Sequence, residues 1–234
     1  MQEFAQDAYD QALYSPQDNH WTVGTHSVTG WIRVYDQIRD LIAAMQRAGF
    51  DVWIVTASPQ HVVDAISFEA VGVLPSHVIG IRSVIEDGLL TAHFQGCGTV
   101  ADGADSLITF DEGKRCWINN VILQLAADQQ MVRQTDANLR PVFVAGDSDT
   151  DIAMLKDASV LKLVVNRKKT QIMCNALANH GGTWLVQPMF IEPKACRTSP
   201  YACTTATDPA GVTIVDETGA AFTMDYADSI CMLP

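Results

Sequence analysis

Residues 141–155 constrain the fold of this 234-residue chain more than any other stretch. They open with the apolar run 142–145, which is long enough for a strand buried on both faces of a parallel sheet. Gly146 then permits a sharp turn, and an apolar helical pattern starts at Ile152. Between them stand three aspartates at alternate positions: Asp147, Asp149 and Asp151. We therefore expect a buried strand that delivers an acidic loop to the edge of a sheet.

Carboxylates this close in the chain repel one another unless a cation neutralises them or one of them takes a proton. Oxygen ligands suit a hard divalent cation, and Mg²⁺ is the natural candidate. A second interpretation needs no metal, because aspartate is also a good N-terminal cap and the turn could simply cap the helix. Taken alone, the stretch leaves both interpretations open.

Other segments repeat the alternation of helix and buried strand. Residues 31–48 carry apolar side chains at helical spacing, and the apolar run 52–55 follows. That run ends in two hydroxyl residues, Thr56 and Ser58, before a further helical pattern. Two more strands are expected over residues 160–165 and 184–188. The pattern predicts an α/β fold, a parallel sheet with helices on both faces.

In such sheets, ligands bind beyond the carboxyl ends of the strands. We therefore expect Thr56 and Ser58 to stand at the same edge of the sheet as the acidic loop.

Lys114 begins a helical pattern that continues through residues 117–125. A lysine is electrostatically misplaced at the start of a helix, so a nearby anion would explain its position. The alternative is a solvated surface lysine.

The remaining segments suggest three parts. A short helix is expected in the first residues, followed by irregular chain to residue 30. Hairpins are expected over residues 78–94 and 212–224, the latter turning at Asp216, and residues 95–106 form a loop. We accordingly divide the chain into an N-terminal cap remnant or extension (1–30), an α/β core (31–190) and a C-terminal appendage with a hairpin (191–234).

Composition restricts the partners. The chain is 48% hydrophobic and 18% charged, which is typical of a globular protein. Its net charge of −12 argues against nucleic acid as a partner and repels large anionic substrates unless a local cation attracts them. No apolar run is long enough for a membrane span, and the first residues do not resemble a signal peptide. The oligomeric state cannot be inferred from the sequence.

The six cysteines form no Cys-x-x-Cys pair and the six histidines show no ligand spacing, which argues against a zinc site. Cys196 and Cys203 flank a short loop that a disulfide could close. This slightly favours an oxidising compartment, periplasmic or secreted, over the cytoplasm. Free thiols in a cytoplasmic protein are the alternative.

Together, Thr56, Lys114 and residues 146–151 resemble three motifs of the haloacid dehalogenase (HAD) superfamily of phosphotransferases, in their order and context. The likeness is greatest to its phosphoserine-phosphatase-like branch, which includes bacterial phosphorylcholine phosphatases. It covers roughly residues 31–190. The resemblance implies a Rossmannoid core, with residues 1–30 as the remnant of a helical cap.

The resemblance also implies an activity, the magnesium-dependent hydrolysis of a small phosphorylated metabolite through an aspartyl-phosphate. The catalytic residues would be Thr56, Lys114 and Asp147. Thr56, Ser58 and Lys114 would bind the phosphate. Asp147 would bind Mg²⁺, and Asp151 would ligate the metal or orient its waters.

The first motif of the family, an Asp-x-Asp that supplies the nucleophile after a mid-sheet strand, has no counterpart in residues 1–50. Without that strand, two buried strand edges lack hydrogen-bond partners. Three explanations stay open. The strand and nucleophile lie upstream of a truncated sequence; or the run 212–215 fills the slot with Asp216 as nucleophile; or the chain is a non-catalytic relative that serves in binding or as a scaffold.

Overall fold

The structure is a computed structural model that describes residues 1–231. By its internal contacts the chain divides into two compact units. Unit 1 consists of Met1–Gly96 and Val100–Thr109, and unit 2 of Cys97–Thr99 and the chain from Phe110 onward.

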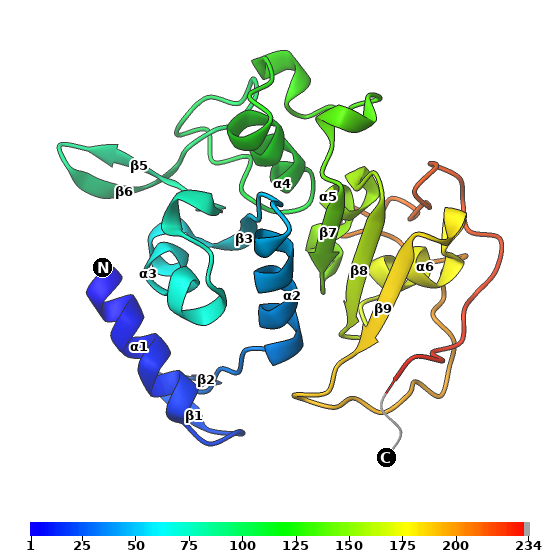
Figure 1. Ribbon diagram of the computed structural model, residues 1–234, viewed down its shortest axis with the longest axis horizontal. Helices are drawn as coiled ribbons and strands as arrows, with labels where there is room; N and C mark the ends of the chain where they lie inside the picture. Colours follow the sequence, from blue (N-terminus) through cyan, green and yellow to red (C-terminus); the bar gives the residue numbers. More distant parts are fainter. Residues whose placement is uncertain (232–234) are drawn as a thin grey trace. The chain divides into compact units, whose positions relative to one another are not determined.

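Unit 1 contains three helices and six strands (Figure 1): α1 (Gln2–Tyr14), α2 (Asp36–Arg47), α3 (Gln60–Val71), β1 (His20–Val23), β2 (His26–Thr29), β3 (Ile54–Pro59), β4 (Val78–Ile81), β5 (Ser83–Glu86) and β6 (Leu89–Phe94). Unit 2 contains α4 (Glu112–Trp117), α5 (Ile152–Asp157), α6 (Thr170–Ala178), β7 (Phe143–Gly146), β8 (Leu161–Asn166) and β9 (Trp184–Pro188).

In unit 1, β3 and β4 pair in parallel, and the pairing becomes irregular between Val55 and Pro59. Gly80 makes the close approach of the two strand ends feasible, because a Cβ there would lie 2.7 Å from both Gln60 Cα and Ser58 O. The Gln60 side chain bridges the same ends, accepting from Gly80 N at 2.7 Å and donating to Val78 O at 3.0 Å. These contacts fix the carboxyl end of β3.

In unit 2, the strands form a parallel sheet in the order β7-β8-β9. Helix α5 packs against β7, and α6 packs against β8 and β9 (Figure 1). Val164, Leu155 and Ile172, from the sheet and these two helices, are fully or almost fully buried in the core. The carboxyl ends of the strands therefore meet at one edge and their amino ends at the other.

The expected α/β fold with parallel sheets is confirmed. Among the described strands, however, β3 pairs only with β4 and β7 only with β8, so each has one unpaired edge. These are the two strands between which the resemblance places the missing first strand of the family. None of the helices in residues 1–231 combines the length and the apolar character that a membrane crossing needs.

Two expectations for unit 1 need correction. Residues 78–94 do not form one hairpin, because Val78–Ile81 pairs in parallel with β3, and the hairpin joins β5 to β6. Residues 15–30 are not irregular throughout, since β1 and β2 form a hairpin there. Both of its strands are mostly exposed, so no apolar alternation marked them in the sequence.

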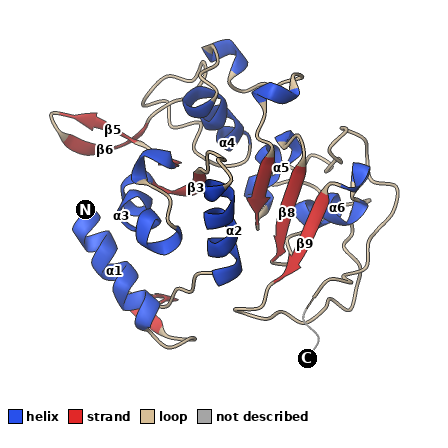
Figure 2. Cartoon of the chain, in the orientation of Figure 1, coloured by secondary structure: helices blue, strands red, loops and turns tan. Residues whose placement is uncertain are grey.

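Two further corrections concern unit 2. The helix expected over residues 117–125 is instead α4, which ends at Trp117, followed by a π-helical turn over Ile118–Ile122. Residues 212–224 contain isolated bridges, such as Val215 with Ala221, and no extended strands. Beyond residue 190 the described chain is almost entirely loop (Figure 2).

Disulfides hold this loop-rich segment in place. All six cysteines are paired, as Cys97–Cys116, Cys174–Cys203 and Cys196–Cys231. The expected closure of a loop between Cys196 and Cys203 is therefore wrong, because these cysteines pair elsewhere. Cys203 attaches the segment to α6, and bridges across 19 to 35 residues typically stabilise a domain by about 3 kcal/mol each.

Asp228 forms a second anchor of the C-terminal segment, and its side chain is fully buried. It pairs with Lys168 Nζ and accepts from Asn166 Nδ2 at 3.0 Å and from Arg197 N at 2.9 Å. Burial alone would raise the pKa of this carboxyl, but the hydrogen bonds from Lys168, Arg197 and Asn166 outweigh it and hold the pKa below its ordinary value.

We predict that Asp228→Asn lowers the free energy of unfolding by about 3 kcal/mol, because it removes one partner of a buried ion pair. The lowered pKa means that the carboxylate stabilises the fold above about pH 4, and that this contribution is lost as the pH falls through the folded-state pKa. Urea unfolding between about pH 2 and pH 7 should therefore show a flatter acid decline in the variant. The exposed Asp40→Asn is the control, and equal losses in both variants would contradict the anchoring role.

Candidate active site

The acidic loop leaves the carboxyl end of β7 and folds back on it. Residues Asp149–Asp151 form a 3₁₀ turn that leads into α5, and Ser148 caps the turn. Ser148 Oγ accepts from Thr150 N at 3.4 Å, and Asp151 Oδ2 accepts from Ser148 N at 3.1 Å, a reciprocal capping box. The turn is therefore a helix cap, as one of the two interpretations proposed.

Gly146 makes this fold-back feasible. A Cβ at this position would lie 2.7 Å from Asp151 Cβ and 2.8 Å from Asp151 Oδ2. Any larger residue would push Asp151 away from the end of the strand. The glycine is thus required by packing against the loop that follows it.

Asp151 and Lys114 form a buried ion pair. They are only 5% and 4% exposed, and Lys114 Nζ donates to Asp151 Oδ1. The other oxygen, Oδ2, accepts from Asp147 N at 2.9 Å as well as from Ser148 N. Asp151 is therefore the anion that the position of Lys114 required, and the alternative of a solvated surface lysine is wrong.

Asp111 connects the start of α4 to the same loop, although the sequence analysis did not select it. Its N–H donates to Thr150 O at 2.8 Å, and its Oδ1 accepts from Ala153 N at 3.2 Å. Burial raises the pKa of this carboxyl. The sequence could have pointed to Asp111, because this residue stands just before a helical pattern and aspartate commonly caps the start of a helix.

The other two carboxylates of the loop have different partners. Asp149 Oδ1 accepts from Ile172 N at 2.9 Å in the first turn of α6, where the helix dipole also favours a negative charge. Asp147 Oδ2 pairs with Arg167 Nη1 at 2.9 Å, just beyond the end of β8. Each of the three carboxylates thus has a hydrogen-bond or ion-pair partner within the chain.

Asp147 is nevertheless the carboxylate best placed to take a metal. Its side chain is 44% exposed and its partner Arg167 is 45% exposed, so the pair is accessible to solvent. Exposed ion pairs are weak and exchange readily. The sequence gives no sign of the contact between Arg167 and Asp147.

The structure brings together Lys114, Asp147 and Asp151 within unit 2. Thr56 and Ser58 lie in unit 1, both half-buried in the irregular end of β3, where Ser58 N donates to Thr56 Oγ1 at 3.2 Å. That these two hydroxyls approach the same ligand as Lys114 stays a prediction.

The fit of these residues to Mg²⁺ is partial. The described residues include no group of three or more His, Cys, Asp or Glu side chains that could hold a metal ion. Asp147 can offer a carboxylate oxygen, whereas both oxygens of Asp151 already accept hydrogen bonds. Since Mg²⁺ commonly binds one or two carboxylates plus waters and phosphate oxygens, Asp147 suffices as a single ligand from this loop.

Asp216 does not take the place of the missing nucleophile. The run before it stays outside the β7-β8-β9 sheet. Its Oδ1 accepts from Thr218 N at 2.8 Å and Ala220 N at 2.9 Å, and its Oδ2 pairs with His180 Nε2 at 2.9 Å. The carboxylate therefore organises a turn of the C-terminal segment, and the structure gives the permuted arrangement no support.

Comparisons with known proteins point to one family. The model of the haloacid dehalogenase-like hydrolase family matches residues 5–156, well over half of the chain. A crystal structure of a conserved, functionally unknown protein from Anaerococcus prevotii DSM 20548 is similar in fold, with a TM-score of 0.58 and 23% sequence identity. The match covers 80% of this chain and 48% of that one, so this chain spans about half of the solved protein. No match was found among curated proteins.

We predict that Lys114→Met lowers the free energy of unfolding by about 3–5 kcal/mol, because it leaves the Asp151 carboxylate buried without its cation. Adding Asp151→Asn should recover part of this loss, since the amide removes the unpaired charge while its oxygen still accepts hydrogen bonds.

Urea unfolding of the single and double variants measures this coupling. The exposed Lys169→Met is the matched control and should change stability by less than about 0.5 kcal/mol. A double variant whose loss equals the sum of the two single losses would show that the pair is not coupled.

Proposed function

Because the chain belongs to the haloacid dehalogenase-like hydrolase family, we propose that it is the core of a magnesium-dependent phosphomonoester hydrolase acting through an aspartyl-phosphate. One observation carries the proposal. A lysine is held by a buried aspartate beside a solvent-accessible aspartate, at the carboxyl end of a parallel strand. Ligands of open α/β sheets bind at such ends.

Asp147 would bind Mg²⁺ through its exposed oxygens, and Asp151 would fix the loop and orient waters of the metal. When bound there, Mg²⁺ neutralises phosphate charge and orients the phosphoryl group. Metal binding there would compete with the exposed ion pair between Arg167 and Asp147. Side chains of this chain would bind the phosphoryl group and stabilise its charge.

Lys114 would donate to a phosphoryl oxygen and stabilise the charge that develops there. Its ion pair with Asp151 fixes the ammonium in place before the substrate arrives, so little reorganisation is needed. Thr56 and Ser58 would donate hydroxyl hydrogen bonds to other phosphoryl oxygens. Because the chain has a net charge of −12, its overall field repels phosphate. These local donors would therefore have to supply the attraction.

The nucleophile is a further part of the proposal. We assign it to an aspartate that follows a further strand, in the way the family's first motif would. Attack on phosphorus would form the aspartyl-phosphate and release the alcohol, and water would then release phosphate. Membership of the phosphoserine-phosphatase-like branch, and a small phosphorylated metabolite as substrate, belong to the same proposal.

A second candidate function is a non-catalytic binding or scaffold protein with the family core. The contact between Arg167 and Asp147 favours it, because an arginine occupies the carboxylate that would hold the metal. The measurements proposed below separate the two functions.

We also propose an oxidising compartment, the periplasm or the cell exterior. The three disulfides support this, because paired cysteines are rare in reducing compartments.

In the complete protein, we predict that Asp147→Asn lowers kcat for p-nitrophenyl phosphate with Mg²⁺ by at least about a hundredfold, because the metal loses its charged ligand. Steady-state kinetics measure this loss. The control is Asp208→Asn, since Asp208 is half-buried and its side chain accepts only from the backbone N–H groups of Ala210 and Val212, which an asparagine oxygen can also satisfy. Turnover retained in the Asp147 variant would contradict the site, and a wild type without turnover would favour the scaffold function.

Arg167→Ala should raise the affinity for Mg²⁺ up to about fivefold, because the guanidinium no longer competes for Asp147. Isothermal titration calorimetry with MgCl₂ measures it. Lys169→Ala removes an exposed cation two residues away and controls for the general change in charge. Equal gains in both variants would mean that Arg167 and the metal do not compete for one carboxylate.

A further inference from the structure

A second charged site lies at the opposite edge of the β7-β8-β9 sheet from Asp147. There, an open pocket of about 550 Å³ is lined by residues that precede or begin the strands: Arg140 before β7, Ser159 before β8, Lys162 in β8 and Thr183 before β9. Glu217 and Thr218 of the C-terminal segment complete it. Its volume falls in the range of roughly 300–1,000 Å³ that is typical of small-molecule sites.

The pocket is positively charged although the chain is acidic. Arg133, Arg140 and Lys162 contribute three permanent cations, and Glu217 is the one carboxylate in the lining, which leaves an excess of two positive charges. Like charges held together in one hollow repel one another unless an anion joins them. The pocket is thus a local attraction for anions on a chain of net charge −12.

Most of these cations are already engaged. Lys162 Nζ pairs with Glu217 at 2.9 Å and donates to Thr183 Oγ1 at 3.0 Å. Arg133 donates to Glu217 O at 3.2 Å and to Lys156 O at 2.7 Å. Arg133 also pairs through Nε with Asp157 Oδ1 at 3.5 Å, a carboxylate outside the lining that Arg115 shares. These contacts hold the two cations in position and offset part of the charge of Arg133.

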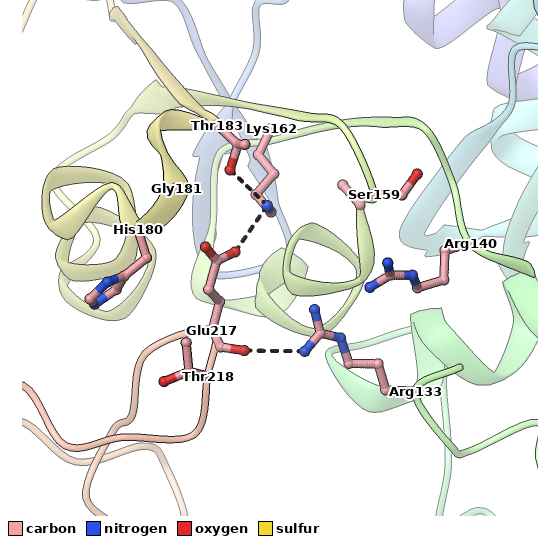
Figure 3. Close-up of a pocket in the computed structure, with 10 residues that line it drawn as sticks. Arg133, Arg140, Ser159, Lys162, His180, Gly181, Thr183, Glu217 and Thr218 are labelled. Carbon is pink, nitrogen blue, oxygen red and sulfur yellow. Dashed lines mark hydrogen bonds and ion pairs between the residues drawn. The ribbon is translucent and has the colours of Figure 1, made fainter. Parts of the chain in front are cut away.

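Arg140 differs from the others. Its Nε is buried and has no hydrogen-bond partner among the described residues. Figure 3 shows its guanidinium extending into the pocket from the same side as that of Arg133, toward Lys162 and Glu217. A buried guanidinium N–H is costly to leave unpaired, so this group is a donor that a bound ligand would satisfy.

The surrounding groups fit an oxyanion. Planar guanidinium groups bind two oxygens of a carboxylate or phosphate at once. Because Thr183 Oγ1 accepts from Lys162, its own proton is available for a further acceptor. We propose that this pocket binds a small oxyanion with at least two negative charges, held chiefly by Arg140 with Arg133 and Lys162. Phosphate-type and dicarboxylate ligands share this chemistry.

Titration calorimetry with inorganic phosphate, at low ionic strength in a buffer freed of divalent metals by chelating resin, tests the proposal. We expect saturable binding of one anion per chain, with a dissociation constant of about 1 mM or tighter. Arg140→Ala should weaken this binding at least tenfold, whereas the exposed Arg47→Ala on α2 should leave it unchanged. Asp147→Asn should also leave it unchanged, which separates this pocket from the proposed active site.

Glu217→Gln provides a second test that does not depend on the folding of the Arg140 variant. It removes the one carboxylate of the lining and should strengthen phosphate binding several-fold. A parallel titration with malonate distinguishes the ligand classes. If either anion binds and Arg140→Ala weakens that binding, the site is supported, and the anion that binds identifies the class as phosphate-type or dicarboxylate. Absence of saturation with both anions, or phosphate binding that survives both substitutions unchanged, would overturn the proposal.

Discussion

The buried ion pair between Lys114 and Asp151 is the interaction on which the rest of the candidate site depends. Removing two charges from water is costly, and a buried pair is tolerated only when further hydrogen bonds satisfy it. Asp151 meets this condition through the N–H groups of Asp147 and Ser148, and Gly146 leaves the room it needs. The pair therefore fixes the lysine, the turn and the direction of Asp147 together.

The same parallel sheet carries charged groups at both of its edges. At the carboxyl ends of the strands, the acidic loop presents Asp147 to solvent beside Arg167. At the amino ends, the C-terminal segment closes a basic pocket around Arg140. That segment has little regular structure, so its position depends on disulfides and on Asp228 instead of a hydrogen-bonded ladder.

Much of the fold could be predicted from local pattern. Strands β7 and β9 are short, mainly apolar runs that end in glycine or proline, and a lysine at the start of a helix implied a nearby anion. The expected burial of residues 142–145 on both faces is wrong, because Val142 and Ala145 are exposed at the edge of the three-stranded sheet. The partners in space could not be predicted. Nothing local assigns Arg167 to Asp147 or Cys203 to Cys174, because such pairs depend on how distant segments pack. The β1–β2 hairpin escaped detection because its exposed strands carry no apolar alternation.

The central claim is that Thr56, Lys114 and Asp147 act on one phosphoryl group. A crystal structure of the complete protein with Mg²⁺ and tetrafluoroberyllate, a phosphoryl mimic, tests it most directly. The account predicts one bound anion that accepts hydrogen bonds from Thr56 Oγ1 and Lys114 Nζ, with Asp147 on the metal and released from Arg167. An anion bound away from these side chains, with Asp147 still paired to Arg167, would contradict it.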